Sequence, residues 1–239
     1  MNERMECIVL RVIPHNERSV IVTCYSDLAG RVSFVSPGGN GREARRRRAL
    51  LMPLGVVECV GCSTGSDLLR VRDVSRPMGI DDFSLNPMKS VVALFVADLL
   101  ETLTRNEERD PYLYQFMRSA IGHLGRAGQR ATANFHLALM AGLIRHAGIE
   151  PDLSTYRKGS YLDLRDGIFR ATPPLHENFL DVEESRRAYT FCHLNLANSR
   201  FFRMNHAGRN RAMDVMLEYI SLHLRDVRNL KSIEVVRSL

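Results

Sequence analysis

The chain has 239 residues, of which 45% are hydrophobic and 25% are charged. This composition is typical of globular domains and excludes collagen-like, repetitive and intrinsically disordered chains. Lys and Arg total 33 against 27 acidic residues, which gives a formal net charge of +6, and all but three of the cations are arginines. Two explanations of the arginine excess stay open at this point: a polyanionic partner, or the codon usage of a G+C-rich genome.

The five cysteines are scattered without the spacing of a disulfide framework, and the first eleven residues, which include Glu3, Arg4 and Glu6, do not form a secretory leader. We therefore expect a reducing, cytoplasmic location. Apolar runs such as residues 137–144 are far shorter than the roughly 20 residues that cross a bilayer. The sequence predicts no membrane span.

The N-terminal third has the pattern of a small all-β domain. Alternating or β-branched runs are separated by turn residues such as Pro14 and Gly30. The expected strands are residues 7–13, 19–25, 31–35, 56–60 and 68–72. Five short strands with a long third connection predict a five-stranded OB-type barrel over residues 1–80, with an SH3-like barrel as the alternative.

The long connection carries most of the charge that distinguishes this third of the chain. A glycine-rich run at residues 36–41 leads into five arginines that are accompanied by a single acid, Glu43. The five are Arg42, Arg45, Arg46, Arg47 and Arg48. We interpret the segment as a flexible loop whose guanidinium groups pair with the phosphates of a polyanion. The alternative is a solvated loop without a partner.

Strand alternation adds further candidates. Arg70 and Arg72 share one side of the fifth strand, and Arg31 lies opposite Phe34 in the third. If the cationic side is the binding side, Tyr25 offers a ring for base stacking beside these arginines. The alternative for Tyr25 and Phe34 is a place in the barrel core.

Helical periodicity begins after residue 80 and continues to the end of the chain, which predicts an α-helical domain over residues 81–239. Asn86 with Pro87, and Asp110 with Pro111, are typical helix starts. The expected helices are residues 86–103, 110–125, 131–147, 181–197 and 209–224. The Asp166-Gly167 pair predicts a β-hairpin within residues 160–170. The fold class is therefore α+β and multidomain.

A second basic surface is indicated by residues 200–203, Arg-Phe-Phe-Arg, and by residues 209–211, Arg-Asn-Arg. Neighbouring acidic residues favour the alternative that this is a solvated face.

Catalytic and metal-binding patterns are weak. Cys59 and Cys62 have the spacing of a redox or zinc motif, but they lie at the end of a predicted strand rather than at the start of a helix, and a second cysteine pair does not follow. The glycine-rich run lacks the lysine of a P-loop. His136 and His146 lie among apolar residues, where a structural role is the simpler interpretation. We expect no catalysis, no metal and no cofactor, with a Cys59/Cys62 redox or metal protein as the rival interpretation.

Taken together, these segments resemble the RecO family of bacterial recombination mediators. The resemblance in the barrel rests on residues 8–10, Glu17, Ser19, residues 21–25, Gly30, Arg31, Phe34, Val35, Gly38 and residues 50–54. In the helical part it rests on residues 87–90, 93–95 and 133–137.

The resemblance implies a DNA repair protein that is not an enzyme. Members of the family are expected to bind single- and double-stranded DNA, to anneal complementary strands, and to work with RecR in loading RecA onto DNA coated by single-strand-binding protein. The resemblance therefore also implies that the protein acts in the cytoplasm in association with the nucleoid. Many members carry a four-cysteine zinc module, but residues 150–170 contain no cysteine. The hairpin is expected in place of that module.

The resemblance also suggests which residues contact the partners. DNA contacts are expected from the five clustered arginines, aided by Arg31, Arg70, Arg72 and Tyr25. The acidic, phenylalanine-ended tail of single-strand-binding protein is expected in a basic-rimmed apolar pocket of the helical domain. The candidates there are Phe116, Arg118, Arg130 and Phe135. An OB-fold adaptor that binds protein rather than DNA is a further alternative.

Overall fold

The computed structural model describes residues 3–17, 19–38, 40–62 and 68–239. The chain forms two compact units. Unit 1 comprises Met1–Ala127 and Leu230–Ser238, and unit 2 comprises Gly128–Asn229 with Leu239. Residue 80, where the sequence analysis divides the chain, lies within unit 1, and that division into domains stays a prediction.

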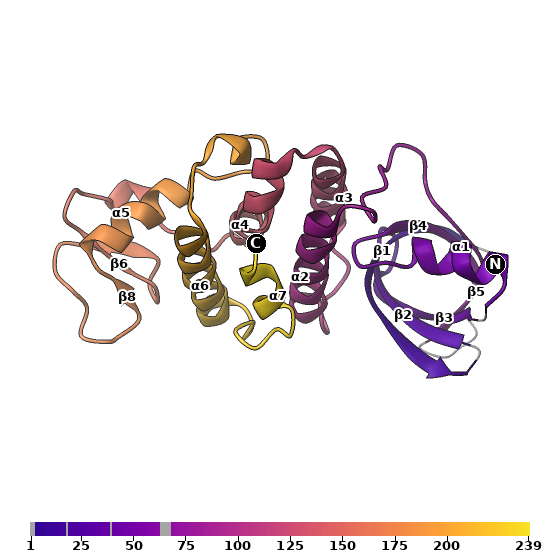
Figure 1. The fold of residues 1–239 in the computed structure, drawn as a ribbon. Helices are drawn as coiled ribbons and strands as arrows, with labels where there is room; N and C mark the ends of the chain where they lie inside the picture. Colours follow the sequence, from indigo (N-terminus) through magenta and orange to yellow (C-terminus); the bar gives the residue numbers. More distant parts are fainter. Residues whose placement is uncertain (1–2, 18, 39, 63–67) are drawn as a thin grey trace. The chain divides into compact units, whose positions relative to one another are not determined.

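Five strands of unit 1 form a closed barrel (Figure 1). They are β1 (Glu3–Asn16), β2 (Ser19–Ser26), β3 (Gly30–Pro37), β4 (Val56–Cys62) and β5 (Leu68–Ser75). The order around the barrel is β1-β2-β3-β5-β4, with β4 returning to pair with β1. All neighbours are antiparallel except β3 and β5, which are parallel. The expected OB-type barrel is confirmed, and this order decides against the SH3-like alternative.

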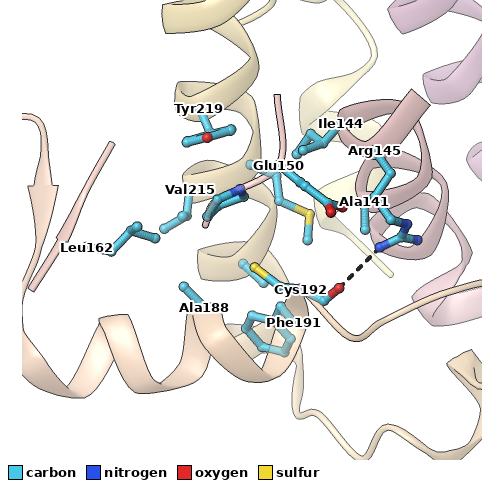
Figure 2. Close-up of a pocket in the computed structure, with 13 residues that line it drawn as sticks. Ala141, Ile144, Arg145, Glu150, Leu162, Ala188, Phe191, Cys192, Val215 and Tyr219 are labelled. Atoms are coloured by element: carbon cyan, nitrogen blue, oxygen red, sulfur yellow. Dashed lines mark hydrogen bonds between the residues drawn. The ribbon is translucent and has the colours of Figure 1, made fainter. Parts of the chain in front are cut away.

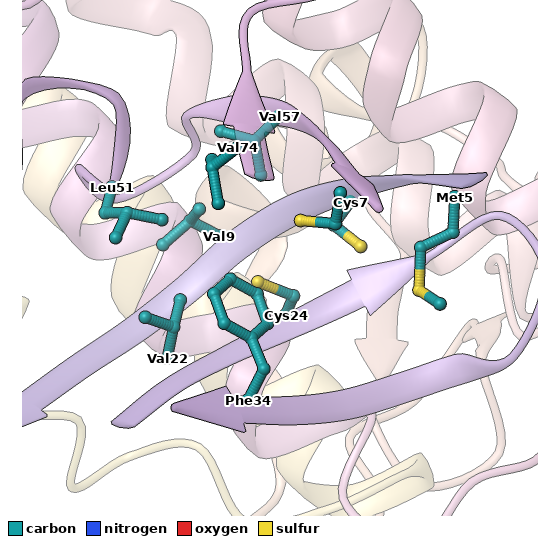
Figure 3. Close-up of a cluster of buried hydrophobic side chains, with 10 residues drawn as sticks. Met5, Cys7, Val9, Val22, Cys24, Phe34, Leu51, Val57 and Val74 are labelled. Carbon is teal, nitrogen blue, oxygen red and sulfur yellow. The ribbon is translucent and has the colours of Figure 1, made fainter. Parts of the chain in front are cut away.

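The barrel interior is filled by small and medium apolar side chains from alternate strand positions (Figure 3). Phe34 is its largest member and is 1% exposed. Around it lie Met5, Cys7, Val9, Val22, Cys24, Leu51, Val57, Cys59 and Val74. The core role offered as the alternative for Phe34 is therefore the one the structure shows.

Unit 1 also contains helices, which are α1 (Arg42–Leu50), α2 (Pro87–Leu103), α3 (Pro111–Arg126) and α7 (Ile233–Arg237). The predicted starts of α2 and α3 are confirmed. The Asn86 side chain accepts a hydrogen bond from the backbone N–H of Lys89, and the Asp110 carboxylate accepts from those of Tyr112 and Leu113. These side chains satisfy backbone donors that a helix start leaves unpaired.

Unit 2 is built around α4 (Gln129–His146), whose residues 134–144 are all buried. Its other elements are η1 (Leu153–Thr155), β6 (Tyr161–Asp163), β7 (Ile168–Arg170), β8 (Phe179–Leu180), α5 (Val182–Phe191), η2 (Ser199–Phe201) and α6 (His206–His223). The β6–β7 hairpin at Asp166-Gly167 is confirmed, whereas β8, which pairs with β6, is not anticipated by the sequence pattern. The helix expected over residues 181–197 ends at Phe191. In the described part of the chain, no helix has the length and apolar character needed to cross a membrane.

The hairpin is held by a charged cluster around Asp163, whose side chain is 1% exposed. Its carboxylate accepts hydrogen bonds from Arg170 Nε at 2.8 Å and from the backbone N–H groups of Arg165 and Asp166 at 3.0 and 3.2 Å. His176 Nε2 lies 3.3 Å from the same carboxylate. Burial alone opposes ionisation, but these donors hold the pKa of Asp163 below its usual value.

We expect Asp163→Asn to lower the free energy of unfolding of unit 2 by about 2–4 kcal/mol at neutral pH, because the amide removes the buried negative charge that Arg170 and His176 contact, although Arg170 keeps its ion pair with Asp166. A carboxylate with a lowered pKa stabilises the fold above its unfolded pKa of about 4, and this stabilisation is lost as pH falls through the lower folded value. Urea unfolding from pH 7 to pH 3 checks this. A difference between variant and parent that stays constant over this range contradicts the assignment.

Candidate nucleic-acid interface

The clustered arginines lie on a helix rather than on the flexible loop expected from the sequence. Helix α1 spans Arg42–Leu50, and the glycine-rich run ends at its first capping residue, Gly41. Arginine, alanine and leucine favour helices, Glu43 lies in the first turn, and Arg47 and Arg48 lie in the last, where the helix dipole favours their charges. The local propensity of this segment therefore outweighs the signal of the preceding glycines.

The arginine side chains project from α1 into solvent. The helix buries none of its own residues; Arg47 is half-buried, and the other four arginines are exposed. Arg45 Nε donates a hydrogen bond to the carbonyl oxygen of Asn40 at 3.2 Å. Helical spacing places Arg42 beside Arg45 and Arg46, and like charges three or four residues apart repel each other. A polyanion bound along α1 relieves this repulsion.

The C-terminal end of α1 is fixed to the barrel. Leu51, which is 7% exposed, belongs to the barrel core, and Leu50 packs against that core. The Leu51 backbone N–H caps the helix by donating to the carbonyl of Arg47 at 3.0 Å. Gly55 follows in a tight turn, where a Cβ atom would lie 2.4 Å from the Leu50 carbonyl oxygen. The barrel therefore anchors a helix whose charged part is exposed.

Tyr25 does not present a stacking surface, which corrects the prediction made for it. The residue is 3% exposed, and its hydroxyl both accepts from the backbone N–H of Asp110 at 3.0 Å and donates to the Asp110 carbonyl at 3.3 Å. Burial raises the pKa of Tyr25. Its ring packs inside unit 1 instead, which agrees with the alternative of a core role.

Arg31 is also engaged within unit 1. Its Nη1 donates to the backbone carbonyl of Glu101 in α2 at 2.7 Å, and its Nη2 lies 3.3 Å from the Glu101 carboxylate. Arg11 contacts the same carboxylate at 3.4 Å. Because Glu101 is buried, its charge requires these partners. The guanidinium of Arg31 is therefore directed to α2 rather than to solvent.

Arg70 and Arg72 are two residues apart on β5, in agreement with the strand expected there. Their side chains lie outside the described residues, so their contribution to binding stays a prediction.

The four partner-binding candidates are divided between the two units. Phe116 and Arg118 lie on α3 in unit 1, and Arg130 and Phe135 lie on α4 in unit 2. Phe135 is 2% exposed and belongs to the core of unit 2, whereas Arg130 is exposed. The structure therefore offers Arg130, but not Phe135, to a partner.

Arg118 and Tyr114 both bind Glu6, a residue that sequence reasoning missed. The Glu6 carboxylate accepts from Arg118 Nε and from the Tyr114 hydroxyl, each at 2.6 Å. This pairing raises the pKa of Arg118, and burial together with the bond to Glu6 raises that of Tyr114. The available signal was a carboxylate directly before the apolar run at residues 7–10.

One cysteine of the rival redox interpretation, Cys59, lies in the barrel core. Cys59 is fully buried with Cys7 and Cys24. The Cys59 hydrogen bond to Cys7, together with burial, raises the pKa of the Cys59 thiol, which disfavours the reactive thiolate. The side chain of Cys62 lies outside the described residues. Among the residues that the structure describes, no three His, Cys, Asp or Glu side chains are grouped as a metal site requires.

A closed OB-type barrel that carries an exposed arginine helix defines the chain as a protein of the OB-barrel class. Comparison with known proteins then gives the family. The model "Recombination protein O N terminal" matches residues 1–76, and "Recombination protein O C terminal" matches residues 85–232. The chain belongs to the recombination protein O (RecO) family.

Similar proteins cover almost the whole chain. "DNA repair protein RecO" of Bacteroides fragilis is 30% identical over 234 residues, which are 97% of this chain and 96% of the relative. The protein of the same name from Porphyromonas gingivalis is 28% identical over 97% of this chain and 96% of its own length. That of Flavobacterium psychrophilum is 24% identical over 99% and 98%, respectively. These names describe DNA repair proteins and mention no catalytic activity.

We expect Tyr25→Phe to lower the free energy of unfolding by about 1 kcal/mol, because both hydrogen bonds to Asp110 are lost while the ring stays buried. Its affinity for single-stranded DNA is expected to equal that of the parent. Urea unfolding and fluorescence anisotropy with a labelled oligothymidylate measure the two effects. Unchanged stability with weakened DNA binding would show instead that the hydroxyl contacts DNA.

Proposed function

We propose that the chain is a DNA-binding recombination mediator without enzymatic activity that acts in DNA repair, in the cytoplasm and at the nucleoid. It binds single- and double-stranded DNA, anneals complementary strands and, with RecR, promotes loading of RecA onto DNA coated by single-strand-binding protein. The observation that carries the DNA-binding part of this proposal is helix α1, on which five arginines lie within seven residues beside the barrel.

The chemistry of α1 suits phosphate rather than base recognition. Guanidinium groups form forked hydrogen bonds with phosphate oxygens and stay charged at every physiological pH. Such contacts position a strand without reading its sequence. We therefore expect binding that is insensitive to sequence and steeply dependent on salt, with Arg70 and Arg72 of the neighbouring β5 as additional contacts. Tyr25 and Arg31 are left out of this set because both are engaged within unit 1.

Replacing all five α1 arginines with alanine is expected to weaken binding to single-stranded DNA. The slope of log affinity against log salt is expected to become shallower by about 3.5, because each phosphate that the variant no longer neutralises removes roughly 0.7 from the slope. Fluorescence anisotropy over a salt series measures both quantities.

The matched control replaces the same five residues with lysine, which keeps the charge and is expected to keep most of the salt slope. Circular dichroism of each variant verifies that the barrel is folded. Equal affinity and slope in the parent and the alanine variant would overturn the proposal and favour a barrel that binds protein.

The acidic, phenylalanine-ended tail of single-strand-binding protein is the proposed protein ligand of the helical part. The four candidate residues belong to two different units, and the test uses the exposed Arg130 of unit 2, because Phe135 is buried and Arg118 binds Glu6. We expect Arg130→Ala to weaken binding of a synthetic tail peptide about three- to ten-fold, a typical loss for one charge-assisted hydrogen bond. Titration of the labelled peptide, with Arg165→Ala as the control, tests this. Equal binding by both variants would remove Arg130 from the site.

A further inference from the structure

Unit 2 contains a second concentration of positive charge that α1 does not account for. Residues 185–213 include six arginines and two histidines but no aspartate or glutamate, although the chain has 27 acidic residues in all. The six are Arg186, Arg187, Arg200, Arg203, Arg209 and Arg211. We call residues 185–213 the acid-free segment. It runs from α5 through η2 into α6.

Helix α4 holds the backbone of the acid-free segment at two places. Arg145 donates to the carbonyl oxygens of Cys192 at 3.2 Å and Leu194 at 3.0 Å, and Figure 2 shows the first of these bonds at the edge of an apolar cavity. Farther along the segment, the donor is Asn134, which is 1% exposed. Its amide nitrogen donates to the carbonyls of Ser199 and Phe202, each at 2.9 Å. The turn between these two carbonyls is therefore fixed.

The fixed turn presents an aromatic ring to solvent. Phe201 is 66% exposed, and the guanidinium carbon of Arg200 lies 4.6 Å from the centre of its ring. A single exposed phenylalanine on a surface loop needs no explanation, but the backbone on both sides of this one is held by a buried amide. A rigid aromatic ring beside a stacked arginine is the arrangement on which single-stranded bases stack.

The arginines continue from the turn along a groove. Arg203 is exposed and lines a groove of about 580 Å³ together with Arg187 and Arg211. Glu184 is the one carboxylate among the groove residues described, and it pairs with Arg211, whereas Arg187 pairs with Glu183. Arg203 adds a third guanidinium group to these two ion pairs, so the groove has an excess of one positive charge next to the aromatic turn. This arrangement matches a chain that alternates bases and phosphates.

We propose that the acid-free segment is a second binding surface for single-stranded nucleic acid, with a base stacked on Phe201 and phosphates held by Arg200 and Arg203. This inference rests on the proposed function and extends it, because one chain would then hold one strand at α1 and another at unit 2. A protein that binds two strands separately brings them together, which annealing requires. An acidic peptide also matches the arginines, but it gives no role to the exposed ring outside the groove.

The first test measures the affinity of full-length variants for a fluorescein-labelled oligothymidylate. Arg200→Ala with Arg203→Ala is expected to make the salt slope shallower by about 1.4. Phe201→Ala is expected to weaken binding at this surface at least about five-fold, whereas Phe201→Tyr keeps the ring and most of the affinity. The matched controls are Arg228→Ala and Leu175→Ala, which remove an exposed arginine and an exposed leucine of unit 2 outside the acid-free segment.

The effects of the Arg200/Arg203 and Phe201 substitutions on affinity are clearest when these substitutions are added to the five-alanine α1 variant, because binding at α1 is removed there. Native mass spectrometry then counts strands for each chain. Two strands on the parent, one on the α1 variant, one on the Arg200/Arg203 variant and none on the combination support the proposal. If α1 does not bind DNA, the α1 variant keeps the parent's count, so failure of the proposed function is recognised separately.

The proposal is overturned if the Arg200/Arg203 and Phe201 variants match the two controls in affinity, salt slope and strand count. It is equally overturned if these variants lose binding of a labelled oligoglutamate peptide but keep parental DNA binding, since the surface would then serve an acidic protein segment.

Discussion

Closure of the barrel through the parallel β3–β5 pair is the constraint on which the rest of unit 1 depends. Residues 33–35 of β3 pair with residues 68–70 of β5. Because β5 occupies this edge of β3, the next strand in sequence, β4, cannot pair with β3 there. The chain after β3 must therefore cross to reach β4 between β1 and β5. Helix α1 makes this crossing, and Leu51 at its end enters the barrel core. The arginine helix is thus positioned by the same topology that closes the barrel.

Two carboxylates around the barrel form ion pairs within unit 1. Glu6 and Glu101 are satisfied by Arg118 and by Arg11 with Arg31, all within unit 1. These pairs hold α2 and α3 against strands, since a buried carboxylate without a partner is costly. Among the arginines of unit 1, one class pairs with a buried or half-buried carboxylate, and a second class, on α1, is largely exposed to solvent. The second class is the one suited to a phosphate backbone.

Local patterns in the sequence predict most of the strands and the long helices, but not α1 or β8 and not the surroundings of the elements. Strand alternation, the caps at Asn86 and Asp110 and the Asp166-Gly167 turn act over a few residues, and each predicts the element that the structure shows. The prediction for Tyr25 is wrong because strand alternation assigns side chains to two faces of the sheet but does not show which face is covered by a helix that is distant in sequence. Helix α1 is not predicted because the preceding glycines indicate a loop. The pairing of Glu6 with α3 joins residues more than a hundred positions apart, and no local signal specifies it.

The central claim is that α1, anchored to the barrel and otherwise exposed, is where DNA binds unit 1. Hydrogen–deuterium exchange with and without a saturating oligothymidylate tests this most directly, because α1 buries none of its residues and carries mutually repelling charges. The account predicts that exchange of the amides of residues 44–50 slows markedly on binding, while residues 7–10 of the barrel core remain unchanged. Slower exchange elsewhere in unit 1, with α1 unaffected, would contradict it.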